Sequence, residues 1–374
     1  MTSQDRRPAE AAQSLGILPL VHARGRHGEL GYQVGVDRAS QVRRMVETYR
    51  RLLRDERTEL GVEDWSQAVA IARRYLPFIE EGLPQYVEEM RGLAQGAAVA
   101  FEDILVLNSI ESITADRLHL GCTSLAVSGR ASADGAVLVA HNEDWYPDDM
   151  EDVFLVHARP EGEPPFLAVS YGGLLPNIGF NAAGIAQCCD TVYATDVRLG
   201  IPRTIVARHV LTAGSIEEAA EFAVNPHRAA GYNHLLASAE GTIFNLEASA
   251  ARSRRVPSAG GLTAHTNHYL SPAMVSVEVE PETRLRSRAR LTRARRRLEQ
   301  EAGHIDEAGL MDVLADHDGF PYSICSHVLE EPSPLDNQQT IASLVMDLTH
   351  RTMTAGWGNP CRATFAEFAL PERW

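Results

Sequence analysis

The 374-residue chain has few cysteines, and its five follow no regular spacing. An odd and irregular set argues against a disulfide framework, and disulfides are rare in reducing compartments. We therefore expect a reducing, cytoplasmic location.

Long apolar runs are also missing. No stretch approaches the roughly 20 apolar residues with which a helix crosses a bilayer. Residues 1–26 hold only the short apolar patch Leu15–Val21, which contains a proline and precedes no convincing small-residue cleavage site. We expect neither a signal peptide nor a membrane partner.

Positive charge is in deficit, with 35 basic against 50 acidic residues and a formal net charge of −15. That balance argues against a nucleic-acid partner, because phosphate binding needs a positive surface. The arginine-rich run from Arg284 to Arg297 departs from it. Leu291, Ala294 and Leu298 are spaced to share one helical face, which predicts a helix with a solvated arginine face. In the alternative interpretation, these arginines bind the phosphate groups of a coenzyme A thioester.

The most informative feature present is Gly121-Cys122-Thr123-Ser124, which leads into the apolar run Leu125-Ala126-Val127. A thiol at a strand start, after the least hindered residue, has the layout of a nucleophile that attacks the peptide bond before it. Cutting Gly121–Cys122 would give Cys122 a free α-amine, which can serve as base for its own thiol. The alternative is a small buried hydrophobic residue after a turn.

A polar turn at residues 128–135 separates this run from a second apolar run at residues 136–140. Two such runs around a turn predict a hairpin, which brings Asn142 and Asp144 back towards Cys122. Asp144 would orient the α-amine, and Asn142 would hold a substrate.

Hydrophobic periodicity predicts an α+β fold. Apolar residues three and four apart predict helices at 42–54, 65–79, 83–95 and 101–110, and later at 201–211, 215–224 and 284–299. β-like runs follow Cys122 at 153–157, 166–171, 234–239, 242–247 and 341–348. Strands interrupted by blocks of helices indicate a layered core.

Five motifs together resemble a known family, the penicillin acyltransferase (C45) family of N-terminal-nucleophile hydrolases. They are Gly121–Ser124, Asn142–Trp145, Gly179–Gly184, His265–His268 and Pro321–Cys325, in that order. The resemblance runs from about residue 87 to about residue 350. A helical segment upstream of the cysteine, at residues 88–104, also looks like this family.

The resemblance implies a four-layer αββα sandwich with a helical N-terminal segment. It implies self-cleavage between Gly121 and Cys122, so that residues 1–121 and 122–374 form one globular unit of two fragments. Cys122 would form a thioester with the acyl group of an amide and pass it to water or an amine. Asp144 would lie near the new amine, and the side-chain N–H of Asn267 would stabilise the oxyanion.

Further residues are expected around the substrate. Ser124 matches a hydroxyl near the family's nucleophile, and we add Asn142, Asn181, Asn233 and Ser323 as substrate-binding candidates. Asn181 could instead be a turn residue, and Asn233 and Glu247 could make structural hydrogen bonds.

The chain also departs from the family's pattern. Ser326 stands where many relatives place arginine, and Asp336-Asn337 stands where the fungal enzyme has Ser-Arg. We therefore expect the penicillin nucleus, an anionic acceptor, to bind poorly.

Metal and cofactor predictions are negative. His265, His268, His317 and Asp318 were weighed as zinc ligands, and we predict no metal, because no cysteine pair joins them. Cys188-Cys189 is read as two buried residues. No cofactor is predicted, although a coenzyme A thioester stays open as a substrate. The expected partner is a small-molecule amide or acyl thioester, and the competing hypothesis is an inactive relative that serves as a binding module.

Overall fold

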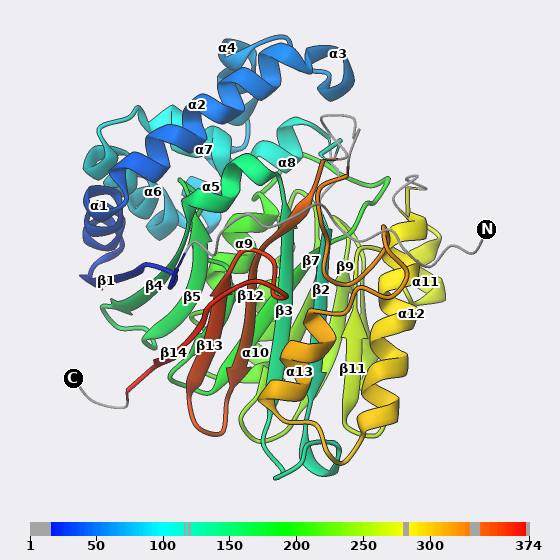
Figure 1. Cartoon of the computed structure of the whole chain (residues 1–374). Coiled ribbons are helices and arrows are strands. Elements are labelled where there is room, and N and C mark those ends of the chain that lie inside the picture. Colours follow the sequence, from blue (N-terminus) through cyan, green and yellow to red (C-terminus); the bar gives the residue numbers. More distant parts are fainter. Residues whose placement is uncertain (1–15, 116, 119–120, 280–283, 330–336, 372–374) are drawn as a thin grey trace.

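A computed structural model describes residues 16–115, 117–118, 121–279, 284–329 and 337–371. Two β-sheets face each other in the middle of the molecule, and helices cover their outer faces (Figure 1). The predicted α+β class and the four-layer αββα arrangement are confirmed.

The first sheet has eight strands, and the second has six. In spatial order the first comprises β1 (Leu20–Gly25), β4 (Val153–Pro160), β5 (Phe166–Tyr171), β6 (Ile178–Asn181), β7 (Ile185–Thr191), β8 (Tyr232–Ser238), β9 (Ile243–Ala248) and β10 (Ser253–Pro257). The second comprises β11 (Leu262–His265), β2 (Gly121–Val127), β3 (Leu138–Trp145), β12 (Gln339–Asp347), β13 (Thr352–Trp357) and β14 (Phe365–Ala369). All described pairings are antiparallel except β1 with β4.

Two pairs of helices form the outer layers. On the first sheet, α10 (Ile216–Ala223) packs against β8 and β9 and against α9 (Arg203–Val210). On the second sheet, α12 (Arg284–Glu301) and α13 (Glu307–Leu314) cover β11, β2, β3 and β12. Between the sheets, β2 packs on β7 and β8, and every residue of β2 is buried.

The segment before Cys122 is mainly helical, as predicted, and lies along one edge of the sheets (Figure 1). Its helices are α1 (His27–Asp37), α2 (Ala39–Asp55), α3 (Arg57–Leu60), α4 (Trp65–Ala72), α5 (Leu76–Gly82), α6 (Pro84–Ala97), α7 (Phe101–Leu107) and α8 (Ile110–Ile113). A short helix, α11 (Pro272–Val275), lies further along the chain.

Among the details that differ from the sequence prediction, two concern the segment before Cys122. The helix expected over 65–79 is two helices, because Pro77 is accepted only in the first turn of a new helix, α5. The helical segment also contributes a strand, β1, to the first sheet through parallel pairing with β4. The two parts of the chain thus share one sheet.

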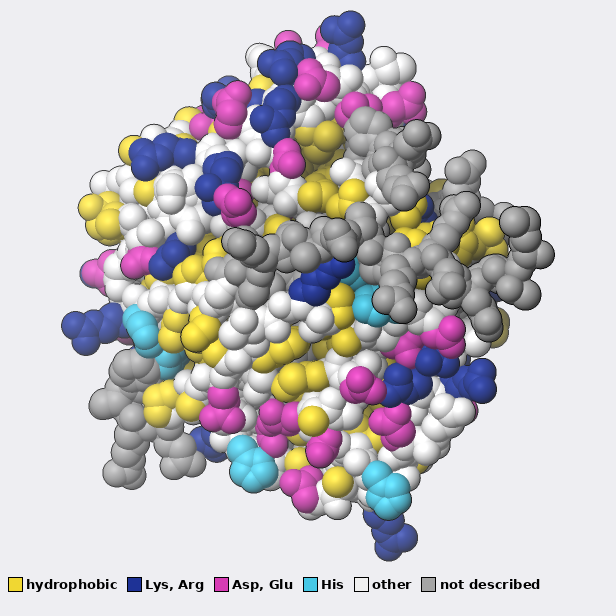
Figure 2. All heavy atoms as spheres, viewed as in Figure 1, with side chains coloured by type: hydrophobic (Ala, Val, Ile, Leu, Met, Phe, Trp, Pro, Cys, Tyr) yellow, Lys and Arg dark blue, Asp and Glu magenta, His cyan; other side chains and the backbone are white. Residues whose placement is uncertain are grey.

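The surface carries many charged side chains of both signs. On the face shown in Figure 2, acidic and basic side chains are interspersed, and apolar side chains gather in the middle. Within the described residues, no helix combines the length and apolar character that a membrane crossing requires.

Candidate active site

The predicted hairpin forms, and it sets the site's register. β2 pairs with β3 so that Gly121 lies opposite Asp144 and Cys122 opposite Glu143. Side chains alternate between the faces of a strand, so Cys122 and Ser124 share one face while Gly121 and Thr123 share the other. Cys122 is 2% exposed.

The Cys122 thiol points to a buried pair of ionisable groups on β3. Sγ lies 3.6 Å from Glu143 Oε2, to which the thiol donates, and the same oxygen lies 2.8 Å from His141 Nε2. Tyr171 donates a hydrogen bond of 2.9 Å to the other carboxylate oxygen. Burial, together with the negative charge of Glu143, raises the pKa of the Cys122 thiol well above its usual range. The thiol therefore needs a base before it can attack.

His141 carries a proton on both ring nitrogens. Ser124 donates its only hydroxyl hydrogen to Asp190 Oδ1 at 2.8 Å, so the 3.0 Å contact with His141 Nδ1 has the ring as donor. Burial lowers the pKa of His141, but hydrogen bonds with Cys122, Cys188 and Glu143 outweigh it and raise this pKa well above the usual range. An imidazolium thus lies between Glu143 and Ser124.

The polar network continues between the sheets. Asn233 donates to Asp190 Oδ2 at 2.9 Å, and its own Oδ1 accepts no hydrogen bond from the described residues. His265 Nδ1 lies 3.5 Å from the same carboxylate oxygen, and its Nε2 lies 3.0 Å from Glu247 Oε1. Burial lowers the pKa of His265, but hydrogen bonds to Asp190 and Glu247 outweigh it and raise the pKa to about 9. Asn233 is therefore part of the buried network around Asp190, and its role in substrate binding stays a prediction.

A second group of side chains surrounds the backbone of Cys122. Asn267 Oδ1 accepts the Cys122 N–H at 2.9 Å and a hydrogen bond from Arg290 at 2.7 Å. Arg290 also donates to the Cys122 carbonyl oxygen and to Thr123 Oγ1. The Asn267 amide nitrogen donates to the Thr191 carbonyl oxygen at 3.1 Å, so one of its two hydrogens is already used. The oxyanion role of Asn267 stays a prediction, and the observed contact is to the nucleophile's nitrogen.

The Asp144 side chain lies on the face of β3 towards Arg290 of α12. Its Oδ1 accepts a hydrogen bond of 2.6 Å from Thr340, and its Oδ2 is 4.0 Å from Arg290 Nη1. Burial raises the pKa of Asp144 to about 6, against the opposing effects of Arg290 and Thr340. A Cβ built on Gly121 would lie 3.2 Å from Asp144 Oδ2, which places this carboxylate directly beside the predicted cleavage point.

Three predicted substrate-binding residues have structural contacts instead. Asn142 faces α13, donating to the carbonyl oxygens of Leu314 and Ile324 and accepting from Ser343. Asn181 donates to the Leu211 and Ala213 carbonyl oxygens and accepts from two backbone N–H groups of its own turn, which fits the turn alternative. Ser323 donates to the Cys325 carbonyl oxygen. The substrate-binding role of all three remains a prediction without a contact to the nucleophile's network.

Four residues of the network were missed from the sequence. Glu143 lies within the Asn142–Trp145 motif and His141 directly precedes it. Strand alternation from Cys122 would have selected both, because residues on one face of a hairpin recur every second position. Asp190 follows Cys188-Cys189 in β7, which faces β2. Arg290 is one turn before Ala294 and two turns before Leu298, so helical spacing would have placed it on the inner face of α12.

The arginine run accordingly differs from the fully solvated face that we predicted. Arg290 is buried at the site, whereas Arg293 and Arg297 are held by Asp316 on the segment that follows α13. These ion pairs neutralise part of the positive charge that phosphate binding would need. The coenzyme A alternative stays a prediction.

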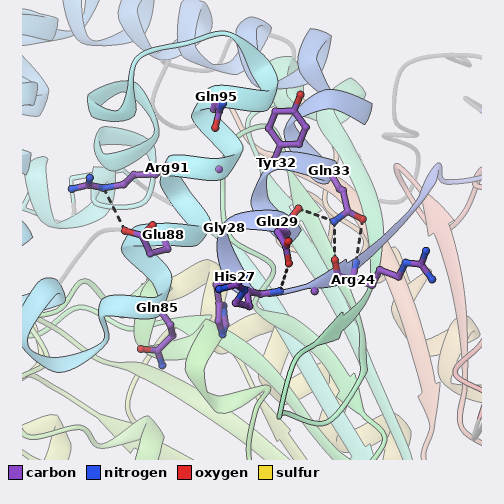
Figure 3. Close-up of a pocket in the computed structure, with 13 residues that line it drawn as sticks. Arg24, His27, Gly28, Glu29, Tyr32, Gln33, Gln85, Glu88, Arg91 and Gln95 are labelled. Carbon is purple, nitrogen blue, oxygen red and sulfur yellow. Dashed lines mark hydrogen bonds and ion pairs between the residues drawn. The ribbon is translucent and has the colours of Figure 1, made fainter.

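A large surface groove lies away from the nucleophile. It has a volume of about 1270 Å³ and opens between α1 and α6, where Arg24, His27, Tyr32, Gln85 and Arg91 line it (Figure 3). None of its lining residues belongs to the Cys122 network. A smaller hollow of about 320 Å³ lies at the end of β3, lined by Tyr146, Asp148 and Asn337 among others, and it is closer along the chain to Asp144. Asp336 lies outside the described residues.

Two facing sheets between helical layers, with a cysteine heading an inner strand, form the architecture of the N-terminal-nucleophile hydrolases. The chain belongs to the acyl-coenzyme A:6-aminopenicillanic acid acyl-transferase family, whose model matches residues 131–362. Asp144 and Asn267 lie within that match, whereas Cys122 lies nine residues before it. The predicted family is confirmed.

Relatives by sequence include acyl transfer and amide hydrolysis enzymes. The chain is 23% identical to the 40 kDa form of acyl-coenzyme A:6-aminopenicillanic-acid-acyltransferase from Emericella nidulans, covering 91% of this chain and 92% of that one. It is 25% identical to the beta-alanyl-dopamine/carcinine hydrolase of Drosophila melanogaster, over 54% of this chain and 56% of that one.

Two solved structures that match part of the chain are a bile acid hydrolase and a penicillin acylase. A mutant of the conjugated bile acid hydrolase from Clostridium perfringens matches 67% of this chain and 97% of its own with 11% identity and a TM-score of 0.44. Penicillin V acylase from Agrobacterium tumefaciens matches 63% of this chain and 83% of its own with 15% identity and a TM-score of 0.41.

Proposed function

We propose that this protein is a self-processed cysteine hydrolase or acyltransferase that cleaves a small-molecule amide through a Cys122 thioester. The observation that carries the proposal is the buried convergence of Glu143 on the thiol, and of Asn267 and Arg290 on the backbone of the same residue. Membership of a family whose relatives transfer or hydrolyse acyl groups supports the same chemistry.

The first step is the cut itself. Glu143 accepts the thiol proton, and Sγ forms a bond to the Gly121 carbonyl carbon. The Gly121–Cys122 C–N bond then breaks, and the proton passes to the departing nitrogen. Water hydrolyses the resulting thioester, which leaves a Gly121 carboxylate and a free thiol and α-amine on Cys122. Gly121 suits this step because a side chain there would crowd Asp144.

Turnover uses the new amine as the base. Asn267 Oδ1, which accepts the Cys122 N–H in the uncut chain, would hold this nitrogen, with Arg290 fixing the asparagine. The amine takes the thiol proton as Sγ attacks the substrate carbonyl, and it returns that proton to the leaving nitrogen. Water or an amine then attacks the thioester and releases the acyl group.

The decisive experiment is the intact mass of the purified protein under denaturing conditions. We expect two species, residues 1–121 and 122–374, for the wild type and a single chain for Cys122→Ala. Cys189→Ala is the matched control, because this neighbouring buried thiol contacts Asn177 and His234 instead of the nucleophile. A wild-type chain that stays whole yet hydrolyses amides would refute self-processing.

The roles of Asn267 and Asp144 are tested in the same assay. If Asn267 supplies the oxyanion contact, Asn267→Ala lowers amide turnover by about 100- to 1,000-fold. If Asp144 orients the amine, Asp144→Asn slows both the cut and turnover. An Asn267→Ala enzyme with the wild-type rate would exclude the asparagine from the mechanism.

The competing hypothesis of an inactive binding module predicts a different result. Such a protein would stay uncut and release no acid from any amide, although its fold would be intact. A panel of phenylacetyl and aminoacyl amides, with and without 6-aminopenicillanic acid, separates the cases. We expect release of free acid to exceed formation of penicillin, because Ser326 replaces the arginine that many relatives carry.

A further inference from the structure

Four potential metal ligands converge outside the nucleophile's network. His317, Cys325, His327 and Cys361 each present one ligand atom, and these atoms all lie within 4.8 Å of one another. Cys325 and His327 are buried, His317 is half-buried and Cys361 is exposed. The first three lie on the segment after α13, and Cys361 lies between β13 and β14.

Hydrogen bonding alone does not explain the cluster. His327 Nε2 has three close neighbours, at 3.0 Å from His317 Nε2, 3.3 Å from Cys325 Sγ and 3.5 Å from Cys361 Sγ. A ring nitrogen makes one in-plane hydrogen bond, as donor or acceptor, and so serves one of these neighbours. A cation at the centre would serve all four ligands at once.

The distances match the edges of one tetrahedron. With Zn–S of about 2.3 Å and Zn–N of about 2.0–2.1 Å, a tetrahedral Cys₂His₂ site has edges of about 3.8 Å (S–S), 3.6 Å (S–N) and 3.3 Å (N–N). The Cys325–Cys361 sulfur distance is 3.7 Å, and the three distances from His327 Nε2 given above lie close to the S–N and N–N values. Two thiolates and two imidazoles are also the ligand set that zinc prefers in structural sites.

We propose that His317, Cys325, His327 and Cys361 bind a structural zinc ion. Binding releases the two thiol protons to water and leaves a neutral site with no ligand position open. This proposal is independent of the function proposed for Cys122. It also reverses our sequence prediction, which weighed His317 with His265 and His268. Neither of those two belongs to a metal-ligating cluster among the described residues.

The zinc would fix a loop that reaches the active site. Asn359, two residues before Cys361, donates to the Ser326 carbonyl oxygen, and its amide nitrogen lies 3.8 Å from Cys325 Sγ. The Ser326 N–H donates to Thr340 Oγ1, and Thr340 donates to Asp144. The ion therefore lies one residue from a chain of hydrogen bonds that ends on the carboxylate beside Gly121.

Metal analysis of the full-length protein, purified without chelators, tests the proposal. We expect about one zinc per chain in the wild type, in line with a closed four-ligand site. His317→Ala and Cys361→Ser, both at positions outside the packed core, should each lose most of it. His227→Ala, at an exposed histidine elsewhere, and Cys122→Ala, which removes the buried thiol beside His141 and Glu143, should keep it.

Two further measurements guard against misfolded variants. Cobalt added to chelator-treated wild type should give a thiolate-to-metal absorption band that Cys361→Ser lacks. Chelation should lower the melting temperature of the wild type and leave that of Cys361→Ser unchanged. A zinc-free protein that takes up neither zinc nor cobalt, zinc retained in both ligand variants, or a Cys325–Cys361 disulfide seen by mass would each overturn the proposal.

Discussion

At the scale of single residues, the titration of Asp144 makes the site sensitive to pH. Its pKa is about 6, whereas the ordinary value is 3.8, because burial disfavours the charged form more than Arg290 and Thr340 favour it. The folded state thus binds this proton more tightly than the unfolded state. Asp144 costs stability as pH rises from about 4 to about 6, and above about 6 it is ionised, the form in which it is proposed to orient the amine.

We predict that self-processing slows as pH falls below about 6, with the slope of one proton. Thr340→Val removes a hydrogen bond to the carboxylate and should move the midpoint to higher pH. Ser343→Ala, on the same strand but bonded to Asn142, should leave it in place. The test is the rate of chain cleavage, measured from pH 4.5 to 8 for each variant. A rate that does not change with pH would contradict the role of Asp144 in self-processing.

The central residues occur in recognisable sequence motifs, whereas their partners do not. Cys122, Asp144 and Asn267 belong to such motifs, and the structure places all three around one peptide group. Arg290 is one of eight arginines between residues 284 and 297, and only its helical spacing from Ala294 and Leu298 distinguishes it from the others. The proposed zinc ligands could not be grouped from sequence, because Cys361 is 36 positions from Cys325 and only the β13–β14 connection brings them together.

At the scale of elements, a buried ion pair joins α6 to α9. Arg208 is fully buried and donates two hydrogen bonds of 3.0 Å to Glu89, with its guanidinium 4.4 Å from the centre of the Phe166 ring. His27 adds a 2.6 Å contact to the same carboxylate. Breaking such a pair leaves a buried charge without its partner.

We therefore predict that Glu89→Gln destabilises the protein by about 3–5 kcal/mol. Glu88→Gln, which alters an exposed neighbour whose nearest arginine nitrogen is 3.9 Å away, should change stability by less than about 1 kcal/mol. Urea unfolding followed by circular dichroism measures both. Equal midpoints for the two variants would show that the buried pair is not stabilising.

Strongly periodic helices could be predicted, and α1 could not. α1 lacks an apolar stripe because it meets α6 through glycines: a Cβ on Gly31 or Gly35 would collide with the backbone of α6, and one on Gly92 with that of α1. Such packing buries backbone against backbone, so hydrophobic spacing carries little signal. β1 was missed because its sequence, Leu-Val-His-Ala-Arg-Gly, has only two large apolar residues, side by side at its start.

At the scale of the whole molecule, the proposed cut would not separate two independent bodies. β1 completes the first sheet beside β4, and Glu111 of α8 binds Arg203 and Tyr232, which lie beyond the cut. We predict that the two fragments elute together in native size-exclusion chromatography and separate only in denaturant. Separation under native conditions would show that the shared sheet does not hold them.

The position of Cys122 has one more consequence, because this chain contains no lysine. Every basic side chain is arginine or histidine, so the amine at the start of the chain is the only primary amine before processing. A cut at the head of β2 would create a second one, on the residue whose nitrogen Asn267 holds. An amine-reactive reagent applied to the denatured protein therefore reports the proposed catalytic base directly, as one label on an uncut chain and two on a processed one.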